Sequence, residues 1–174
     1  ATSDDEDTLW LGPFDGPWEL EVDIPPGSFV TGPKSFGAER LVLWTGAIAQ
    51  LLDSRTGDAI GKPIEGLSDA PPRLSPDGSM LAVARTSIPG SDGPSVAVRD
   101  AVTGSLLIEA DVAGQPHILH FDIDAGHLLV ATADSRLVTV DLSDGEILAD
   151  VGFEGGQLYN LGVREDGLVI AISA

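Results

Sequence analysis

Cysteine is absent from the 174 residues of this chain, which excludes disulfide bonds, thiolate zinc sites and cysteine nucleophiles. Basic residues are scarce, because 9 Lys and Arg stand against 28 Asp and Glu and leave a formal net charge of −19. Nucleic acid and anionic lipid are bound by clustered Lys and Arg, so we expect neither as a partner. No apolar run approaches the roughly 18 residues of a membrane span, and we expect no signal peptide. The compartment stays open, with the cytoplasm favoured.

Helical periodicity is the next feature that the sequence lacks. No window shows a sustained apolar pattern with a period of about 3.6 residues, so we expect essentially no helix. Hydrophobic residues nonetheless make up 43% of the chain, which is enough to build a core. The apolar runs are short, often alternate with polar residues, and end at Asp-Gly or Thr-Gly turns. This pattern predicts an all-β protein.

Two series of glycine turns repeat along the chain. One precedes apolar runs at spacings of 41, 48 and 41 residues, and the other follows Asp at spacings of 41, 47 and 41. The first series is Gly37, Gly78, Gly126 and Gly167, and the second is Gly16, Gly57, Gly104 and Gly145. The spacings of both series lengthen in the same part of the chain, where residues 86–94 form an insert. A period near 40 residues is typical of a four-stranded propeller blade, so we predict a β-propeller of about four such blades.

The strands of one blade are denoted A to D, from the central channel outward. Strand A is expected at 73–75, 117–122 and 158–163, strand B at 41–44, 80–84, 128–131 and 168–173, and strand D at 59–65, 106–111 and 147–151. Strand C is expected to end at Asp53, Asp100 and Asp141. The N-terminal segments 8–11 and 18–22 correspond to C and D, so the chain begins with C and D and ends with A and B. Residues 8–174 are therefore assigned to blades, and the acidic residues 1–7 to a linker or tail.

Several segments resemble one known family. Residues 74–82 (Leu-Ser-Pro-Asp-Gly-Ser-Met-Leu-Ala) resemble the F-S-P-D-G-x-x-L-A segment of WD40 repeats, and residues 133–141 resemble x-D-x-x-V-x-x-W-D without its Trp. Residues 100–104 resemble the D-x-x-T-G that follows. The chain is thus similar to divergent bacterial WD40-like β-propeller repeats. It departs from them at the Trp-Asp pair, here Leu52-Asp53, Arg99-Asp100 and Val140-Asp141, so the family's Asp-His-Ser-Trp hydrogen-bond tetrad is not intact.

The resemblance bears on the number of blades. Rings of this family usually have about seven blades, which favours a partial or fragmentary propeller over a closed ring of four. The closed ring remains an alternative, because strands C and D of the N-terminus would complete a blade with A and B of the C-terminus. An open array exposes strand edges, which predicts pairing with another chain.

Two segments resemble binding loops. Residues 57–63 are similar to a shortened phosphate-binding loop, but Pro63 replaces the Ser or Thr that binds magnesium, so a C–D turn is favoured. Asp122 and Asp124 stand as at the start of a calcium loop, but the later Glu is missing. An A–B turn is therefore the favoured interpretation of the second segment.

Histidine and tryptophan are the other candidates for chemistry. His117, His120 and His127 are expected to form hydrogen bonds or lie on the surface rather than to bind zinc. The three tryptophans are expected in the core or between blades, whereas an exposed one would indicate a binding site. They are Trp10, Trp18 and Trp44.

Function is expected to reside in loops. Residues 86–94 lie between strands B and C, and B–C and D–A loops share the face on which WD40-like propellers usually bind partners. The candidate partner-binding residues are Ser87, Ile88, Pro89, Ser91, Asp92, Asp69, Gln115 and His117. The alternative interpretation of the insert is a tolerated lengthening, because longer loops cost little.

We therefore expect a non-catalytic protein-interaction or ligand-sensing module of a larger bacterial regulatory or scaffold protein, with no cofactor or metal. One alternative is a propeller hydrolase or secreted binding protein with a central-channel metal ion, which metal-dependent thermal stabilisation would favour. Another is a structural module that self-associates through open edge strands, which a concentration-dependent mass would favour.

Overall fold

The computed structural model describes residues 8–11, 20–23, 28–31, 40–68, 70–85, 93–154, 158–163 and 169–173. All regular elements within these ranges are β-strands, in agreement with the expected all-β class. No helix suited in length and hydropathy to crossing a membrane occurs among them.

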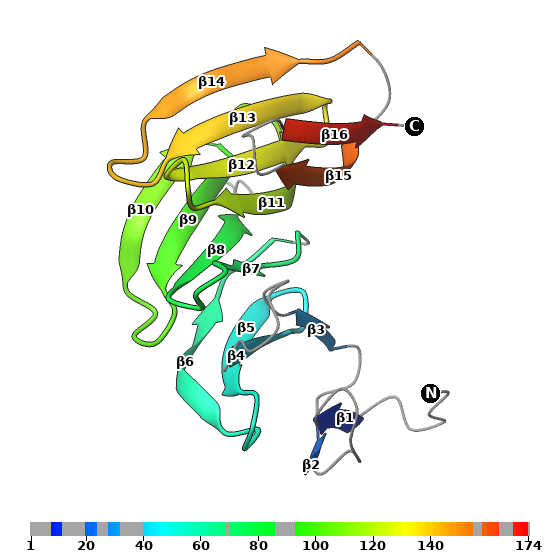
Figure 1. Ribbon diagram of the computed structural model, residues 1–174, viewed down its shortest axis with the longest axis vertical. Helices are drawn as coiled ribbons and strands as arrows, with labels where there is room; N and C mark the ends of the chain where they lie inside the picture. The colour runs from blue at the N-terminus through cyan, green and yellow to red at the C-terminus, as the bar shows by residue number, and fades with distance from the viewer. Residues whose placement is uncertain are drawn as a thin grey trace.

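The strands form three four-stranded antiparallel sheets and two two-stranded sheets (Figure 1). The first sheet contains β3 (Phe29–Thr31), β4 (Arg40–Trp44), β5 (Ile48–Asp53) and β6 (Ala59–Glu65). The second contains β7 (Arg73–Leu74), β8 (Met80–Arg85), β9 (Ser95–Asp100) and β10 (Leu106–Asp111). The third contains β11 (Pro116–Asp122), β12 (His127–Thr132), β13 (Arg136–Asp141) and β14 (Ile147–Gly152). The two-stranded sheets pair β1 (Thr8–Leu11) with β2 (Leu20–Asp23) and β15 (Leu158–Val163) with β16 (Val169–Ser173).

Each four-stranded sheet is a meander, with neighbours in sequence lying side by side. This is the predicted order A-B-C-D, and β1, β6 and β10 have the bounds expected from the sequence. Figure 1 shows β3, β7, β11 and β15 along the inner side of a fan and β6, β10 and β14 along its outer side. The architecture is therefore β-propeller-like.

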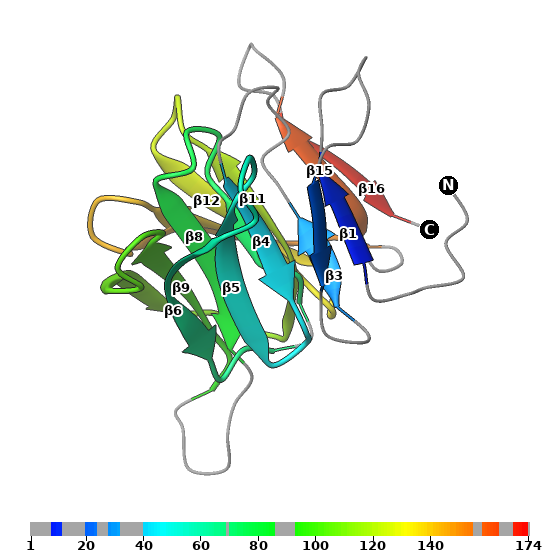
Figure 2. The ribbon, with the colours of Figure 1, turned by 90° about the horizontal axis from the view of Figure 1, so that it is seen from below.

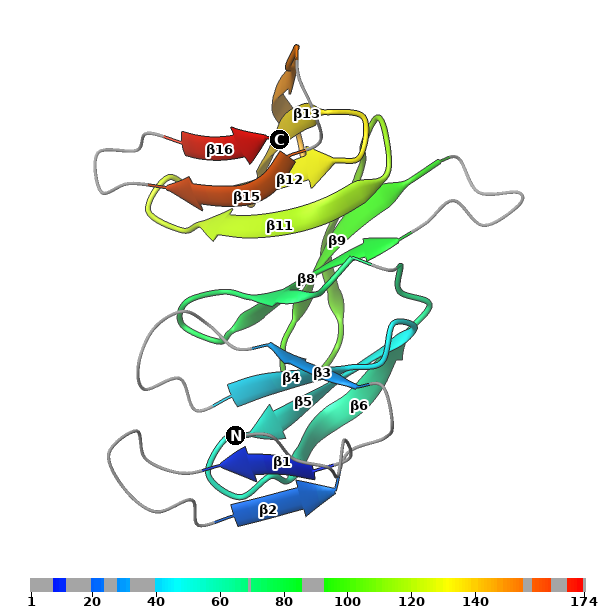
Figure 3. The same cartoon turned by 90° about the vertical axis from the view of Figure 1, so that its right-hand side faces the viewer.

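The two-stranded sheets lie at the ends of the stack. Figure 3 shows β1 and β2 beyond the first sheet and β15 and β16 beyond the third, at opposite ends. Seen from below in Figure 2, strands of the three four-stranded sheets follow one another as successive layers. Among the described residues, β16 pairs with β15 alone and β1 with β2 alone.

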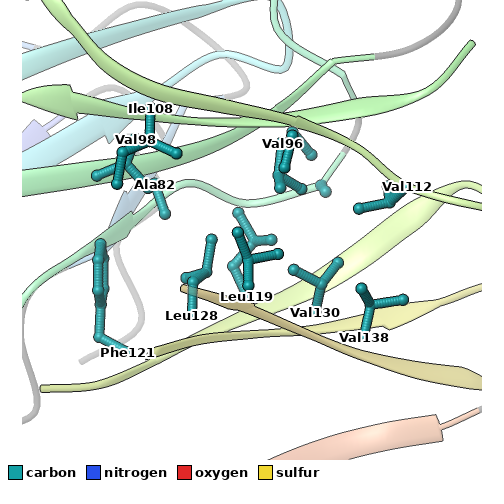
Figure 4. Close-up of a cluster of buried hydrophobic side chains, with 14 residues drawn as sticks. Ala82, Val96, Val98, Ile108, Val112, Leu119, Phe121, Leu128, Val130 and Val138 are labelled. Carbon is teal, nitrogen blue, oxygen red and sulfur yellow. The ribbon is translucent and has the colours of Figure 1, made fainter. Parts of the chain in front are cut away.

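The hydrophobic core lies between the sheets. Val42, Leu51 and Ile64 of the first sheet pack against Leu81 and other apolar side chains of the second. A larger cluster joins the second sheet to the third (Figure 4). Its members include Ala82, Val96, Val98, Ile108, Val112, Leu119, Phe121, Leu128, Val130 and Val138. A smaller cluster joins the third sheet to β15.

Burial follows from this stacking. Strands β8 and β12 are buried along almost their whole length, because the sheets to which they belong are covered on both faces. Strand β10 alternates, with only Ile108 and Ala110 buried, because the outer edge faces solvent. Trp44 is buried, as expected, and its ring centroid lies 5.7 Å from that of Phe29. The side chain of Trp10 and all of Trp18 lie outside the described residues.

Aspartate closes the C–D turn in each of the three four-stranded sheets. The carboxylate of Asp100 accepts hydrogen bonds from the backbone N–H groups of Val102 at 3.0 Å and Thr103 at 2.7 Å. Gly104 follows with φ of 71° and donates its N–H to the carbonyl of Asp100 at 2.9 Å. Glycine adopts this left-handed conformation without a steric cost. In the turns after β5 and β13, the glycine N–H likewise donates to the carbonyl of the aspartate. The repeated pattern in the sequence is therefore confirmed as a repeated turn.

Candidate functional site

The loops between strands B and C and between strands D and A share one face, here called the loop face. Its described residues are 45–47, 66–68, 70–72, 93–94, 112–115, 133–135 and 153–154. The N–H of Ser68, in the first D–A loop, donates to the carbonyl of Ala84 at the end of β8 at 2.9 Å. A Cβ on Gly114 would lie 2.1 Å from the carboxylate of Asp134. The described residues thus confirm that loops of both kinds adjoin.

The loops are anchored to the sheets by one repeated hydrogen bond. A backbone N–H after strand D donates to a carbonyl before strand C in every four-stranded sheet. The bonds are Leu67 N to Ala47 O at 3.2 Å, Val112 N to Pro94 O at 3.0 Å and Phe153 N to Ser135 O at 2.9 Å. These hydrogen bonds hold the ends of the loops on the rigid sheets, as in folds whose binding residues lie on loops.

Most of the predicted binding residues cannot be placed. Ser87, Ile88, Pro89, Ser91, Asp92 and Asp69 lie outside the described residues. Of the insert, only Gly93 and Pro94 at its C-terminal end are described, and they lead into β9.

Gln115 and His117 are described, and both contact the protein framework. The carbonyl of Gln115 accepts the N–H of Ala133 at 2.8 Å and so extends the pairing of β11 with β12. Nε2 of His117 is hydrogen-bonded to the carbonyl of Leu158, which joins the inner strands β11 and β15. Nδ1 of His117 is buried and has no hydrogen-bond partner among the described residues. His117 therefore links the third sheet to β15 through a hydrogen bond, as the sequence analysis expected of the histidines.

Two ion pairs lie beside the loop face. Arg85 of β8 contacts Glu109 of β10 at 3.0 Å, and Arg136 of β13 contacts Asp150 of β14 at 2.8 Å. The hydrogen bond that Nε of Arg136 donates to the carboxylate of Asp150 raises the pKa of Arg136. These contacts neutralise the arginines, so the flanks of the loop face carry no free positive patch from them. Such solvent-exposed pairs contribute little to stability.

The opposite face carries the A–B and C–D turns and is here called the turn face. Its aspartates serve the turns: backbone N–H groups of Arg55 and Thr56 lower the pKa of Asp53, and the hydroxyl of Ser75 lowers that of Asp77. Hydrogen bonds to carboxylates favour the charged form. No group of three or more His, Asp or Glu able to hold a metal occurs in the described part of the chain.

Both segments that resemble binding loops are turns. Residues 57–63 complete a C–D turn and run into β6, as expected. Asp122 ends β11, and Gly126 donates its N–H to the carbonyl of Ile123 at 3.0 Å, which closes an A–B turn. His127 pairs with Asp141 across β12 and β13. The hydrogen bonds of Ser143, followed by the charge of His127, lower the pKa of Asp141.

One exposed apolar surface was missed by residue-level reasoning. Every residue of β14 is exposed, whereas β10, at the same position in the second sheet, buries Ile108 and Ala110. Val151 and Phe153 are 48% and 41% exposed. Among the described residues, β14 is followed by β15 and β16, which correspond to strands A and B.

Comparisons with known proteins support the fold alone. The sequence matches no protein-family model and no curated protein. Among solved structures, the chain is similar to KlHsv2 with loop 6CD replaced by a Gly-Ser linker, with a TM-score of 0.69 and 8% sequence identity. The match covers 88% of this chain and 50% of that one, so the chain spans about half the length of this structural relative. Structural matches extend to 501 chains.

Proposed function

We propose that the chain is part of a WD40-like β-propeller of the bacterial type and a non-catalytic interaction or ligand-sensing module of a larger regulatory or scaffold protein. On this proposal the three four-stranded sheets are complete blades, and the two-stranded sheets are halves of further blades. The observation that supports it best is the repeated anchoring of the loop face, in which one backbone hydrogen bond recurs in all three sheets at 2.9–3.2 Å. A rigid frame that presents variable loops is the usual design of a binding scaffold.

The partner is proposed to be a protein that meets the insert at residues 86–94. The neighbouring D–A loops, residues 66–71 and 113–116, would extend the same contact. Exposed Asp134 lies beside Gly114 on this face and gives it acidic character. A partner with basic and apolar groups would complement it.

The test replaces residues 86–92 with a Gly-Ser linker of equal length. Wild type and variant are immobilised, proteins of the host lysate are captured, and the bound proteins are quantified by mass spectrometry. A matched control carries Asp144→Ser and Glu146→Ser, which change exposed positions of the turn face. We expect the loop variant alone to lose a specific partner while its melting temperature stays unchanged. Equal capture by wild type and loop variant, or a loss only in the turn-face control, would contradict the proposal.

Self-association is a second candidate, favoured by the exposure of β14. Every residue of β14 is exposed, whereas Ile108 and Ala110 of β10 are buried beneath the next sheet. Exposed apolar side chains and open strand edges associate readily. A mass that rises with protein concentration would support this candidate, and a constant mass would exclude it.

A further inference from the structure

The outer strands of the second and third sheets carry four exposed apolar side chains beside their C–D turns. Leu106 and Leu107 begin β10 and are 48% and 52% exposed. Ile147 and Leu148 begin β14 and are 40% and 47% exposed. These four residues are here called the outer patch. Single exposed leucines are ordinary on protein surfaces, whereas large apolar side chains gathered in one place mark binding sites.

The exposure of the outer patch does not depend on what lies beyond the described sheets. The second sheet packs against the first through one apolar cluster and against the third through another. Leu106 and Leu107 are exposed although β10 belongs to this sandwiched sheet. Ile147 and Leu148 begin β14 as the two leucines begin β10. We therefore expect a further sheet beside β14 to leave them exposed as well.

A β-bulge in each outer strand explains how two consecutive side chains can both face solvent. Neighbouring residues of a regular strand point to opposite faces of the sheet. In β10 the pairing with β9 shifts between Leu106 and Ile108, so Leu107 has no residue opposite it. The pairing of β13 with β14 shifts in the same way, and Leu148 is the extra residue. Because bulges re-aim side chains and hinder the addition of another strand, the outer patch suits contact through side chains.

The two apolar pairs flank one contact between the sheets. A Cβ on Gly145, in the turn before β14, would lie 2.7 Å from the side chain of Ile108 on β10. Leu107 directly precedes Ile108, and Ile147 follows Gly145 by two residues. Figure 1 shows this turn beside β10 on the outer side of the fan. The apolar side chains of both strands therefore adjoin on one surface.

The surroundings of the outer patch are acidic. Residues 100–111 and 141–154, which include β10, β14 and the turns before them, contain eight Asp and Glu and no Lys or Arg. Two of these acids, Glu109 and Asp150, are neutralised by ion pairs with arginines of other strands. The remaining acids give the region a negative field, which attracts a basic partner and repels an acidic one. A second copy of the chain would bring the same acidic groups against these, so it fits the outer patch poorly.

We propose that the outer patch binds a segment of a partner protein in which large apolar side chains are flanked by Lys or Arg. The apolar side chains of the segment cover the four residues of the patch, and its basic groups meet the acids around them. The outer patch lies at the starts of β10 and β14, whereas the loop face lies beyond their ends. The inference therefore assigns a second binding surface and does not depend on the insert at residues 86–94.

The first test is a selection of random peptides displayed on phage against the immobilised full chain. Enriched peptides are synthesised with a fluorescent label, and their dissociation constants are measured by fluorescence anisotropy. We expect them to combine Lys or Arg with large apolar residues, and to bind more weakly at about 0.5 M than at about 0.1 M salt. If no peptide is enriched, or if the enriched peptides lack basic residues, the proposal is overturned.

The second test removes apolar side chains from the outer patch. In the variant with Leu107→Ser and Leu148→Ser, we expect the dissociation constants of the selected peptides to rise at least about tenfold, because serine cannot replace the buried leucine surface. The matched control carries Ile48→Ser and Ile123→Ser, since these side chains are also exposed, at 39% and 38%, but lie outside the outer patch. Equal dissociation constants for the two variants would overturn the proposal.

Further variants separate the outer patch from the other surfaces. The variant with Leu106→Ser and Ile147→Ser repeats the second test if the first pair of substitutions lowers the melting temperature. The variant with a Gly-Ser linker at residues 86–92 should bind the selected peptides as the wild type does, so failure at the loop face and failure at the outer patch are distinguishable. Loss of the peptides in the linker variant would place their binding at the loop face and overturn the proposal. A concentration-dependent mass that the serine substitutions abolish would identify a second copy as the occupant and overturn it as well.

Discussion

The substitution Gly61→Ala tests the contact between successive sheets. Gly61 lies in β6 with φ of 67°, a conformation that L-residues rarely adopt. An added Cβ would lie 2.1 Å from the carbonyl oxygen of Val102 and 3.2 Å from its carbonyl carbon. Both atoms belong to the backbone of a turn, so a side-chain rotation cannot relieve the overlap. The C–D turn of the second sheet must instead move away from the first sheet.

The magnitude has two parts. Alanine in the left-handed conformation costs about 1 kcal/mol more than glycine. Overpacking of a closely fitted contact costs roughly a further 1–3 kcal/mol. Gly66→Ala is the matched control, because Gly66 has φ of 73° but no atom within 4 Å of an added Cβ. Only the conformational cost, about 1 kcal/mol, applies to the control.

The assay is thermal and urea unfolding followed by circular dichroism. For a chain of this size, each kcal/mol lowers the melting temperature by about 2–4 °C. We expect a loss of about 4–16 °C for Gly61→Ala and of about 2–4 °C for Gly66→Ala. Equal losses would refute the reasoning, because they would show that the turn of the second sheet does not lie against β6.

Three further predictions address the turns, the core and the joint at β15. The pKa of Asp100 is lowered in the folded chain, chiefly by the N–H of Thr103. The charged carboxylate of Asp100 therefore stabilises the fold fully above its ordinary pKa of 3.8, and this stabilisation is lost as the pH falls through the lowered pKa of the folded chain. The difference in urea midpoint between wild type and Asp100→Asn should accordingly narrow below pH 3.8. Leu128→Ala removes a fully buried side chain between the second and third sheets and should cost about 2–5 kcal/mol in urea unfolding. His117→Ala removes the bond to Leu158, so amide hydrogen exchange should accelerate in β15 while β5 is unaffected, as mass spectrometry can determine.

The strands and turns could be predicted because their signals are local. Asp100 and Gly104 mark a turn through the hydrogen bonds of the aspartate and the positive φ of the glycine, and these need no distant partner. Alternation and short apolar runs then locate the strands between turns. The repeat also predicts the order of strands in every sheet, because the order found in one repeat applies to the others.

The exact correspondence between repeats could not be read from glycines. Gly78 and Gly126 align in the sequence, but the carbonyl of Ser79 accepts the N–H of Ala101 as that of Gly126 accepts the N–H of Leu142. Strand B is therefore offset by 47 residues between these sheets, from Met80 to His127, whereas strand C is offset by 41, from Asp100 to Asp141. The two A–B turns are equally long, since Leu74 pairs with Leu81 and Phe121 with Leu128, but the glycine lies one position later in the second turn.

The candidate site was less accessible from the sequence, because its contacts are long-range. Nothing local to His117 indicates that Leu158, on another sheet, accepts its hydrogen bond. The exposure of Val151 likewise depends on which strands follow β14 rather than on β14 itself. Both features depend on contacts between neighbouring sheets. The sequence predicts such contacts only indirectly, through the order of the strands.

Capture of a protein partner tests the central proposal, that the insert at residues 86–94 mediates binding. Wild type, the variant with a Gly-Ser linker at residues 86–92 and the turn-face control with Asp144→Ser and Glu146→Ser are immobilised in parallel, and the bound proteins are quantified by mass spectrometry. We predict that the linker variant alone loses a specific partner while its melting temperature stays unchanged. Equal capture by wild type and the linker variant would contradict this account.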